Sequence, residues 1–207
     1  MSVLSRAAIL EALKDEDLVV SPILNKEQIG MTSIDLRMGT VVMMARAGAQ
    51  SHVDPVMYDD SEGHDALKEK YQKHERFEIP FRHPFLLHPG ALALVPTLEW
   101  VVLPHYLQGV VTARSSWARE GLNIATANFV NPGYKGIITL ELANLGEIPI
   151  RLYLGLRIAQ IAFYDLNIDR KDETKKEVYK GQFKMNFEPK AGDLTKFDHA
   201  FLPPKKP

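Results

Sequence analysis

The segment that spans residues 114–142 reads RSSWAREGLNIATANFVNPGYKGIITLEL. It begins with an arginine- and serine-rich stretch at 114–120, passes through the turn sequence VNPGY at 130–134, and ends in an alternating strand at 137–142. Pro followed by Gly suits the two central positions of a type II turn, so we predict a hairpin that leads into the strand. The polar stretch fits a short helix capped by serine.

The rest of the chain also consists mainly of short apolar runs separated by Pro and Gly. Strands are predicted at residues 18–20, 32–39, 41–44, 85–87, 91–95, 99–103, 109–113, 150–154 and 157–164. In one of them Ile34 and Leu36 face one side, whereas Asp35 and Arg37 face the other. Many short strands with such punctuation indicate an all-β sandwich or barrel. Ser5 suits the cap of a short N-terminal helix.

The chain has 207 residues, which is enough to bury a substantial core. No repeat or linker divides it, so we predict a single domain over residues 1–207. Residues 48–76 are polar and weakly patterned, which indicates a surface insertion. The tail at 167–207 contains a charge run and ends in PPKKP, a composition typical of a solvated segment that can also close over a site.

Composition excludes several classes of function. The formal net charge is −1, so no general field favours nucleic acid or an anionic membrane. No apolar window is long enough to cross a bilayer, and the N-terminus lacks the apolar core of a signal peptide. The absence of cysteine excludes disulfides and thiolate zinc sites and fits a cytoplasmic protein. Any phosphate binding must therefore come from a local cluster.

The arginine- and serine-rich stretch has two interpretations. Arg114 and Arg119 flank Ser115 and Ser116, and guanidinium groups beside the N–H groups of a helix start suit phosphate oxygens. A capped helix with two surface arginines explains the same residues without a ligand. The stretch alone leaves both interpretations open.

Glu141 is the candidate for acid–base chemistry. It shares a strand face with Ile137 and Ala143, where partial desolvation would raise its pKa and suit it to proton transfer near neutral pH. A sheet face open to water is an equally good interpretation. Asn131 and Tyr134 likewise either serve the turn or line a pocket.

The sequence gives little support to a protein-bound metal or a standard phosphate loop. The seven histidines lack metal-ligand spacing. The only loose cluster of candidate ligands is His64 near Asp59 and Asp60. The phosphate-loop and dinucleotide glycine patterns are absent. The histidine, glutamate and cysteine signature of zinc-dependent nucleobase deaminases is absent as well.

Several blocks together resemble the dCTP deaminase family of the dUTPase-like fold. They are residues 114–119, 126–127, 132–136 and 138–141, with supporting similarity at 33–39, 87–90 and 155–161. The resemblance spans roughly residues 3–185 and implies a distorted β jelly roll that forms homotrimers with active sites between subunits. It implies hydrolysis of dCTP to dUTP and ammonia without zinc, with Mg²⁺ carried by the triphosphate.

The resemblance also implies residue roles. Glu141 would be the general base and acid, Ser115 and the Ala127 carbonyl would position the attacking water, and Arg119 would polarise the site. Arg114, Ser115 and Ser116 would bind the triphosphate. Asn131 would meet the 3′-hydroxyl of the sugar, and Tyr134 the sugar face. The implied substrate-binding residues are Arg114, Ser115, Ser116, Ala118, Arg119, Ala127, Asn131, Tyr134, Thr139, Leu140, Glu141, Tyr179 and Gln182.

Two departures from the family pattern keep alternatives open. Asn131 stands where the family usually carries Asp, which activates water in dUTPases, so hydrolysis of dUTP loses support. Val178 stands where a lysine is expected beside Tyr179. Besides dCTP deamination, the alternatives are a bifunctional dCTP deaminase/dUTPase, a dUTPase alone, and a non-catalytic nucleotide-binding trimer.

Overall fold

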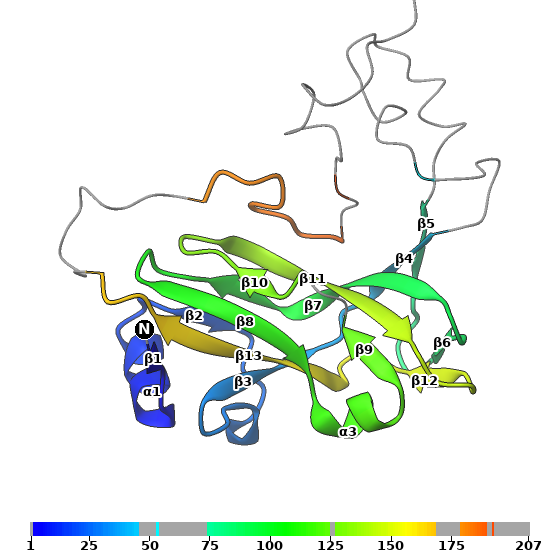
Figure 1. The fold of residues 1–207 in the computed structure, drawn as a ribbon, viewed down its shortest axis with the longest axis horizontal. Coiled ribbons are helices and arrows are strands. Elements are labelled where there is room, and N and C mark those ends of the chain that lie inside the picture. The colour runs from blue at the N-terminus through cyan, green and yellow to red at the C-terminus, as the bar shows by residue number, and fades with distance from the viewer. Residues whose placement is uncertain are drawn as a thin grey trace, which may run out of the picture.

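The computed structural model describes residues 2–45, 53, 74–124, 127–168, 179–189 and 192. These residues form mainly β-strands in two facing sheets, as expected for a jelly-roll sandwich (Figure 1). The first sheet has the strand order β1–β13–β8–β10, and β3 also pairs with β13. Its antiparallel strands are β1 (Ser2–Val3), β3 (Ser33–Arg37), β8 (Leu107–Ala113), β10 (Phe129–Val130) and β13 (Arg157–Asp165).

The second sheet has the order β5–β4–β7–β11–β9, and β2 also pairs with β7. Its strands are β2 (Val19–Ser21), β4 (Val41–Ala45), β5 (His74–Glu78), β7 (Leu92–Val102), β9 (Leu122–Ile124) and β11 (Lys135–Asn144). A separate small sheet pairs β6 (Phe85–Leu87) with β12 (Ile150–Leu152). Residues 150–152 therefore pair with β6 and not with the neighbouring β13.

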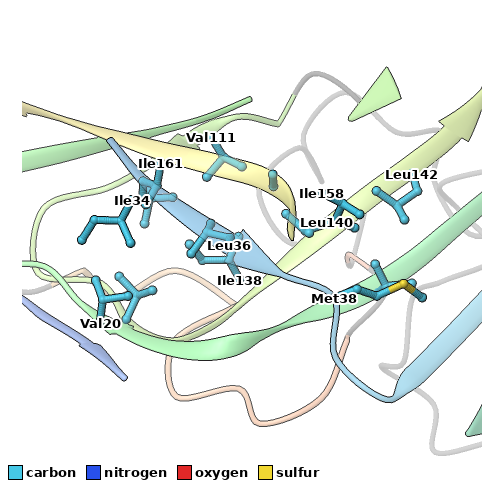
Figure 2. Packing of buried hydrophobic residues seen from close by; sticks show 14 of the residues in the cluster. Val20, Ile34, Leu36, Met38, Val111, Ile138, Leu140, Leu142, Ile158 and Ile161 are labelled. Atoms are coloured by element: carbon cyan, nitrogen blue, oxygen red, sulfur yellow. The ribbon is translucent and has the colours of Figure 1, made fainter. Parts of the chain in front are cut away.

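Apolar side chains from both sheets meet in one core. Ile34 and Leu36 of β3 and Leu140 and Leu142 of β11 are at most 1% exposed, and Figure 2 shows them packed together. Burying each such side chain contributes roughly 2 kcal/mol. The alternation confirms the faces predicted for both strands, and it places the residues between these apolar ones on the outer faces of the sandwich.

Strand β7 runs through Pro96 without a break, so the predicted interruption between residues 95 and 99 is wrong. Proline has no N–H to offer a neighbouring strand. The register between β7 and β11 shifts between Ile137 and Thr139, next to the pairing of Thr139 with Pro96. The N–H of Ile138 donates to Oγ1 of Thr97 at 3.0 Å. A bulge and one hydroxyl thus accommodate the proline inside the sheet.

The NPGY turn does not close a hairpin, contrary to our prediction. β10 pairs with β8 in the first sheet, whereas β11 pairs with β7 in the second. The turn geometry itself is as predicted: the N–H of Tyr134 donates to the C=O of Asn131 at 3.1 Å, and Gly133 has a φ of 74°. The turn therefore carries the chain from one sheet to the other.

Helices are short in the described part of the chain. Helix α1 (Arg6–Lys14) begins where predicted, and the Ser5 hydroxyl accepts from the N–H of Ala8 at 3.3 Å. A single 3₁₀ turn, η1, spans Lys26–Gln28. Helix α3 (Ser115–Arg119) has Arg114 at its N-cap and no side-chain cap, so the predicted serine cap is wrong.

Most of the predicted insertion lies outside the described residues. Its final part, residues 74–76, belongs to β5, which pairs with β4 from Ala45 opposite His74. The boundary of that prediction is therefore too late. Among the helices that the structure describes, none is long and apolar enough to span a membrane.

Candidate active site

Glu141 lies on the outer face of the second sheet, in β11 opposite Leu94 of β7. Burial raises the pKa of its carboxyl above the ordinary 4.5, and a hydrogen bond from the backbone N–H of Ala127 partly offsets this rise. The side chain is thus half-buried, which favours the desolvated interpretation of this position over a fully hydrated one. A carboxyl of this kind exchanges protons closer to neutral pH than an exposed one.

Arg114, which directly follows β8, belongs to an ion-pair cluster. Its Nη1 donates to Oδ2 of Asp35 on β3, and Nη1 of Arg157 on β13 donates to the same oxygen at 3.2 Å. Two arginines against one carboxylate leave a formal charge of +1. Such a cluster can attract an anion while one carboxylate keeps its arginines in place.

Helix α3 displays its polar side chains to solvent. Ser115, Ser116, Ala118 and Arg119 are all exposed. The helix is anchored by Trp117, which is partly buried and donates from Nε1 to the C=O of Arg157 at 3.1 Å. The hydroxyls and the second arginine are therefore free to meet a molecule that arrives from outside.

The predicted catalytic carboxylate and the partner of the phosphate-binding arginine come from different sheets. Asp35, the partner of Arg114, projects from the first sheet on the side opposite its core neighbours Ile34 and Leu36. Glu141 projects from the second sheet, again away from the core. No described arginine contributes to the pKa shift of Glu141, whose carboxyl instead accepts from the backbone of Ala127.

The turn residues lie at the far end of β11 from Glu141. Between Lys135 and Glu141 a strand advances by roughly 20 Å. Asn131 is exposed. Tyr134 is instead buried, and its hydroxyl donates to the C=O of Ile137. Its aromatic ring lies 5.7 Å from that of Tyr179, so the two tyrosines connect the turn to the C-terminal segment.

Thr139 and Leu140 have different relations to the candidate site. Thr139 is partly exposed on the same strand face as Glu141. The side chain of Leu140 is 1% exposed in the core, so this residue has only its backbone to offer a ligand.

The C-terminal segment 179–189 packs along the start of β11. The N–H of Met185 donates to the C=O of Lys135 at 2.7 Å, and the N–H of Ile137 donates to the C=O of Asn186 at 3.1 Å. This segment carries the predicted site residues Tyr179 and Gln182, both partly buried. Val178, the expected departure from the family pattern, lies outside the described residues.

Glu99 is a buried carboxylate that we did not single out from the sequence. It is 0% exposed, and it accepts from Nε2 of Gln28 and from the N–H of Arg37, each at 2.8 Å. Burial raises its pKa, while these hydrogen bonds lower it in part. Glu99 lies two residues before the apolar Val101, and such residues share a strand face. This spacing could have predicted from the sequence that the Glu99 side chain points inward.

Metal-ligating side chains do not gather in the described part of the chain, where no group of three or more His, Asp or Glu could hold an ion. His64, Asp59 and Asp60 lie outside the described residues.

Comparisons with known proteins find related sequences. A profile of the dCTP deaminase-like family matches residues 3–166. The chain is 38% identical over 167 residues to the "dCTP deaminase, dUMP-forming" of Dictyoglomus thermophilum, covering 80% of this chain and 81% of that protein. It is 39% identical over 166 residues to the "dCTP deaminase" of Halorubrum lacusprofundi, covering 79% and 77% of the two chains.

A solved structure shares the fold. The 2′-deoxycytidine 5′-triphosphate deaminase of Agrobacterium tumefaciens superposes with a TM-score of 0.58 at 22% identity. The match covers 78% of this chain and 47% of that one, so the chain spans about half the length of that protein. With the sequence matches above, these findings confirm the resemblance: the chain belongs to the dCTP deaminase-like family.

Proposed function

We propose that this protein is an enzyme that hydrolyses dCTP to dUTP and ammonia. The observation that carries the proposal is Glu141, a half-buried carboxyl whose pKa is raised by burial and which lies on an open sheet face. Such a group can take a proton from water and return it to a leaving amine within one reaction. The two relatives named above, both called dCTP deaminases, support the choice of substrate.

The proposed reaction balances with this chain's own residues. Glu141 removes a proton from water as the oxygen bonds to C4 of the cytosine ring. The same carboxyl passes this proton to N3 of the ring and then carries the hydroxyl proton to the 4-amino group, so that C4=O forms as the C4–N bond breaks and ammonia leaves. Ser115 and the backbone carbonyl of Ala127 orient the water, and Arg119 stabilises the charge that develops. No zinc is required for these steps.

Triphosphate binding is assigned to the start of α3. Arg114 with the exposed Ser115 and Ser116 supplies a guanidinium, two hydroxyls and backbone N–H groups for phosphate oxygens. The Mg²⁺ that accompanies the triphosphate reduces its charge. Asn131 and Tyr134 are proposed for the sugar.

A complete site needs more than one subunit. Within one chain no described arginine contributes to the pKa shift of Glu141, so a neighbouring subunit is proposed to supply the arginines. A contact between two different surfaces of the same chain is heterologous, and it forms a closed ring when the rotation between subunits closes. The smallest such ring is a trimer, so we propose a homotrimer in which one subunit supplies Glu141 and its neighbour supplies α3. The absence of cysteine fits a cytoplasmic location.

A second candidate is direct conversion of dCTP to dUMP. The relative from Dictyoglomus thermophilum carries that activity in its name, as does one from Methanobrevibacter smithii that is 34% identical over 164 residues. Against it stands Asn131, because an amide does not accept a proton from water at neutral pH. Deamination is common to both candidates.

One incubation separates these outcomes. Purified protein treated with EDTA and resupplied with Mg²⁺ alone is incubated with dCTP, and the products are resolved by ion-exchange chromatography. Deamination predicts dUTP and ammonia in equal amounts. Formation of dUMP with pyrophosphate would establish the second candidate. Unchanged dCTP would indicate a non-catalytic nucleotide-binding protein, and a strict need for added zinc would contradict the proposed chemistry.

A further inference from the structure

Asp35 lies between two arginines that come from different elements. Its Oδ2 accepts from Nη1 of Arg114, which precedes α3, and from Nη1 of Arg157 on β13. The side chain of Asp35 is 13% exposed, against 31% for Arg114 and 34% for Arg157. The carboxylate is therefore the inner member of the cluster, and the two cations extend toward solvent.

The backbone holds this carboxylate in a fixed position. Asp35 pairs with Gln160 in the ladder between β3 and β13, and its C=O accepts from Nε2 of Gln28 at 3.0 Å. Its neighbours Ile34 and Leu36 are 0% exposed in the core. A short side chain on a strand anchored in this way gives an adjacent flexible arginine a stable partner.

The two arginines differ in what else they contact. Nη1 of Arg157 also donates to the C=O of Glu27 at 3.3 Å, which connects this side chain to η1. Arg114 directly precedes the exposed hydroxyls of Ser115 and Ser116. A guanidinium carries five N–H groups, so the bond through Nη1 leaves Nε and Nη2 of Arg114 for a second anion.

We propose that Asp35 is a positioning residue that holds Arg114 in the orientation in which it meets the phosphate oxygens of the substrate. This inference rests on the proposed function, because it requires a phosphorylated substrate beside α3. It adds a residue to the site that the sequence blocks did not assign.

Positioning and simple charge predict opposite effects when the carboxylate is removed. The cluster has a formal charge of +1, and Asp35→Asn raises it to +2. If the charge alone mattered, dCTP would bind more tightly to the variant. If Asp35 holds Arg114, the variant loses a charge-assisted hydrogen bond and dCTP binds more weakly. The direction of the change therefore decides between the two.

The test measures kcat and KM for dCTP, and the dissociation constant of Mg²⁺·dCTP by calorimetry, for the full-length protein and its variants. Asp35→Asn should raise KM and the dissociation constant about tenfold while kcat changes less than about threefold, since a hydrogen bond between charged groups is typically worth that much. An unchanged or lower KM overturns the proposal, as does an equal loss of kcat with KM unchanged.

A double-mutant cycle shows whether the effect passes through Arg114. In an Arg114→Gln background, Asp35→Asn should change KM by less than about twofold, because the group that it positions is already gone. A tenfold rise in both backgrounds would indicate a general structural role and overturn the proposal. Arg157→Gln is the matched control: it removes the other arginine from the same oxygen and should raise KM less than Arg114→Gln does. An equal rise would assign the effect to net charge.

Two further measurements keep the test decisive. If Asp35→Asn does not fold, Asp35→Glu replaces it; the extra methylene displaces Arg114, so KM should still rise, and an unchanged KM overturns the proposal. The Mg²⁺ concentration that gives half-maximal activity should match that of the unmutated protein, and a shifted requirement without coupling to Arg114 also overturns it. Lack of turnover by the unmutated protein would refute the proposed function alone, because the dissociation constants still report on Asp35.

Discussion

The pKa of Glu141 sets the acid limit of the proposed reaction. Burial raises this pKa above 4.5, and a general base must be deprotonated to act. As the pH falls through the raised pKa, the carboxyl gains a proton and kcat should fall about tenfold per pH unit. The measurement is kcat at saturating Mg²⁺·dCTP from pH 4 to 8. A midpoint at or below pH 4.5 would contradict a desolvated base.

Glu99 makes the stability of the fold depend on pH in the opposite sense to most carboxylates. Because its pKa is higher in the folded state, the folded protein binds the extra proton, and the contribution of Glu99 to stability is lost as the pH rises through that pKa. In Glu99→Gln this dependence disappears, and one of the two hydrogen bonds from Gln28 and Arg37 is lost as well.

We therefore expect Glu99→Gln to lower the free energy of unfolding by roughly 1–3 kcal/mol near pH 4.5, with a smaller loss at pH 8. Urea unfolding of both proteins across this pH range checks the expectation. Other carboxylates cancel in the comparison, so a loss that grows with pH would contradict the assigned direction of the pKa shift.

At the residue scale, side-chain alternation carried the sequence predictions well. It placed Ile34, Leu36 and Leu140 in the core and Glu141 outside it. Successive side chains of a strand point to opposite faces, so a strand with one buried face alternates apolar and polar residues in the sequence. It did not indicate the partner of Arg114. Asp35 is 79 positions away in the sequence, and only the fold brings the two together.

At the scale of elements, the pairing of β7 with β11 shows how a side chain can replace a backbone acceptor next to a proline in a strand. Thr97→Val keeps the shape of the side chain but leaves the N–H of Ile138 without its acceptor. We expect the free energy of unfolding to fall by about 1–3 kcal/mol, the usual cost of a buried unsatisfied group. Thr97→Ser keeps the hydroxyl and is the matched control. Equal losses in both variants would assign the effect to packing.

Strand existence was predictable, whereas strand partners were not. Most predicted strands occur, yet the break at Pro96 was wrong because the partner's bulge is not visible locally. The NPGY turn was identified with the right geometry, but its flanking strands join different sheets. Local turn chemistry fixes the backbone angles of the two central residues of the turn and does not determine which strand the following segment pairs with.

At the scale of the whole molecule, the proposed trimer, in which neighbouring subunits supply Glu141 and Arg114, predicts complementation between two impaired variants. Glu141→Gln and Arg114→Gln subunits, unfolded together and refolded at equal amounts, form mixed rings. Sites between unlike subunits in one order then have both native residues, so about a quarter of native activity should return at dCTP well below KM.

Each variant refolded alone is the control. Glu141→Gln should stay near background, and Arg114→Gln should keep only the low activity that its raised KM leaves at this dCTP concentration. If the mixture is no more active than the mean of the two controls, both residues act within one chain, and the proposed arrangement of the trimer is wrong. Sedimentation of the unmutated protein should give the mass of three chains.

The most direct test of the account is Glu141→Gln. The amide keeps the shape of the carboxyl but cannot accept and return a proton, so turnover of dCTP to dUTP should fall by at least about a thousandfold. Calorimetry should show that Mg²⁺·dCTP still binds within about threefold of the native dissociation constant, because the phosphate contacts are untouched. Turnover within about tenfold of native would contradict the central role assigned to this carboxyl.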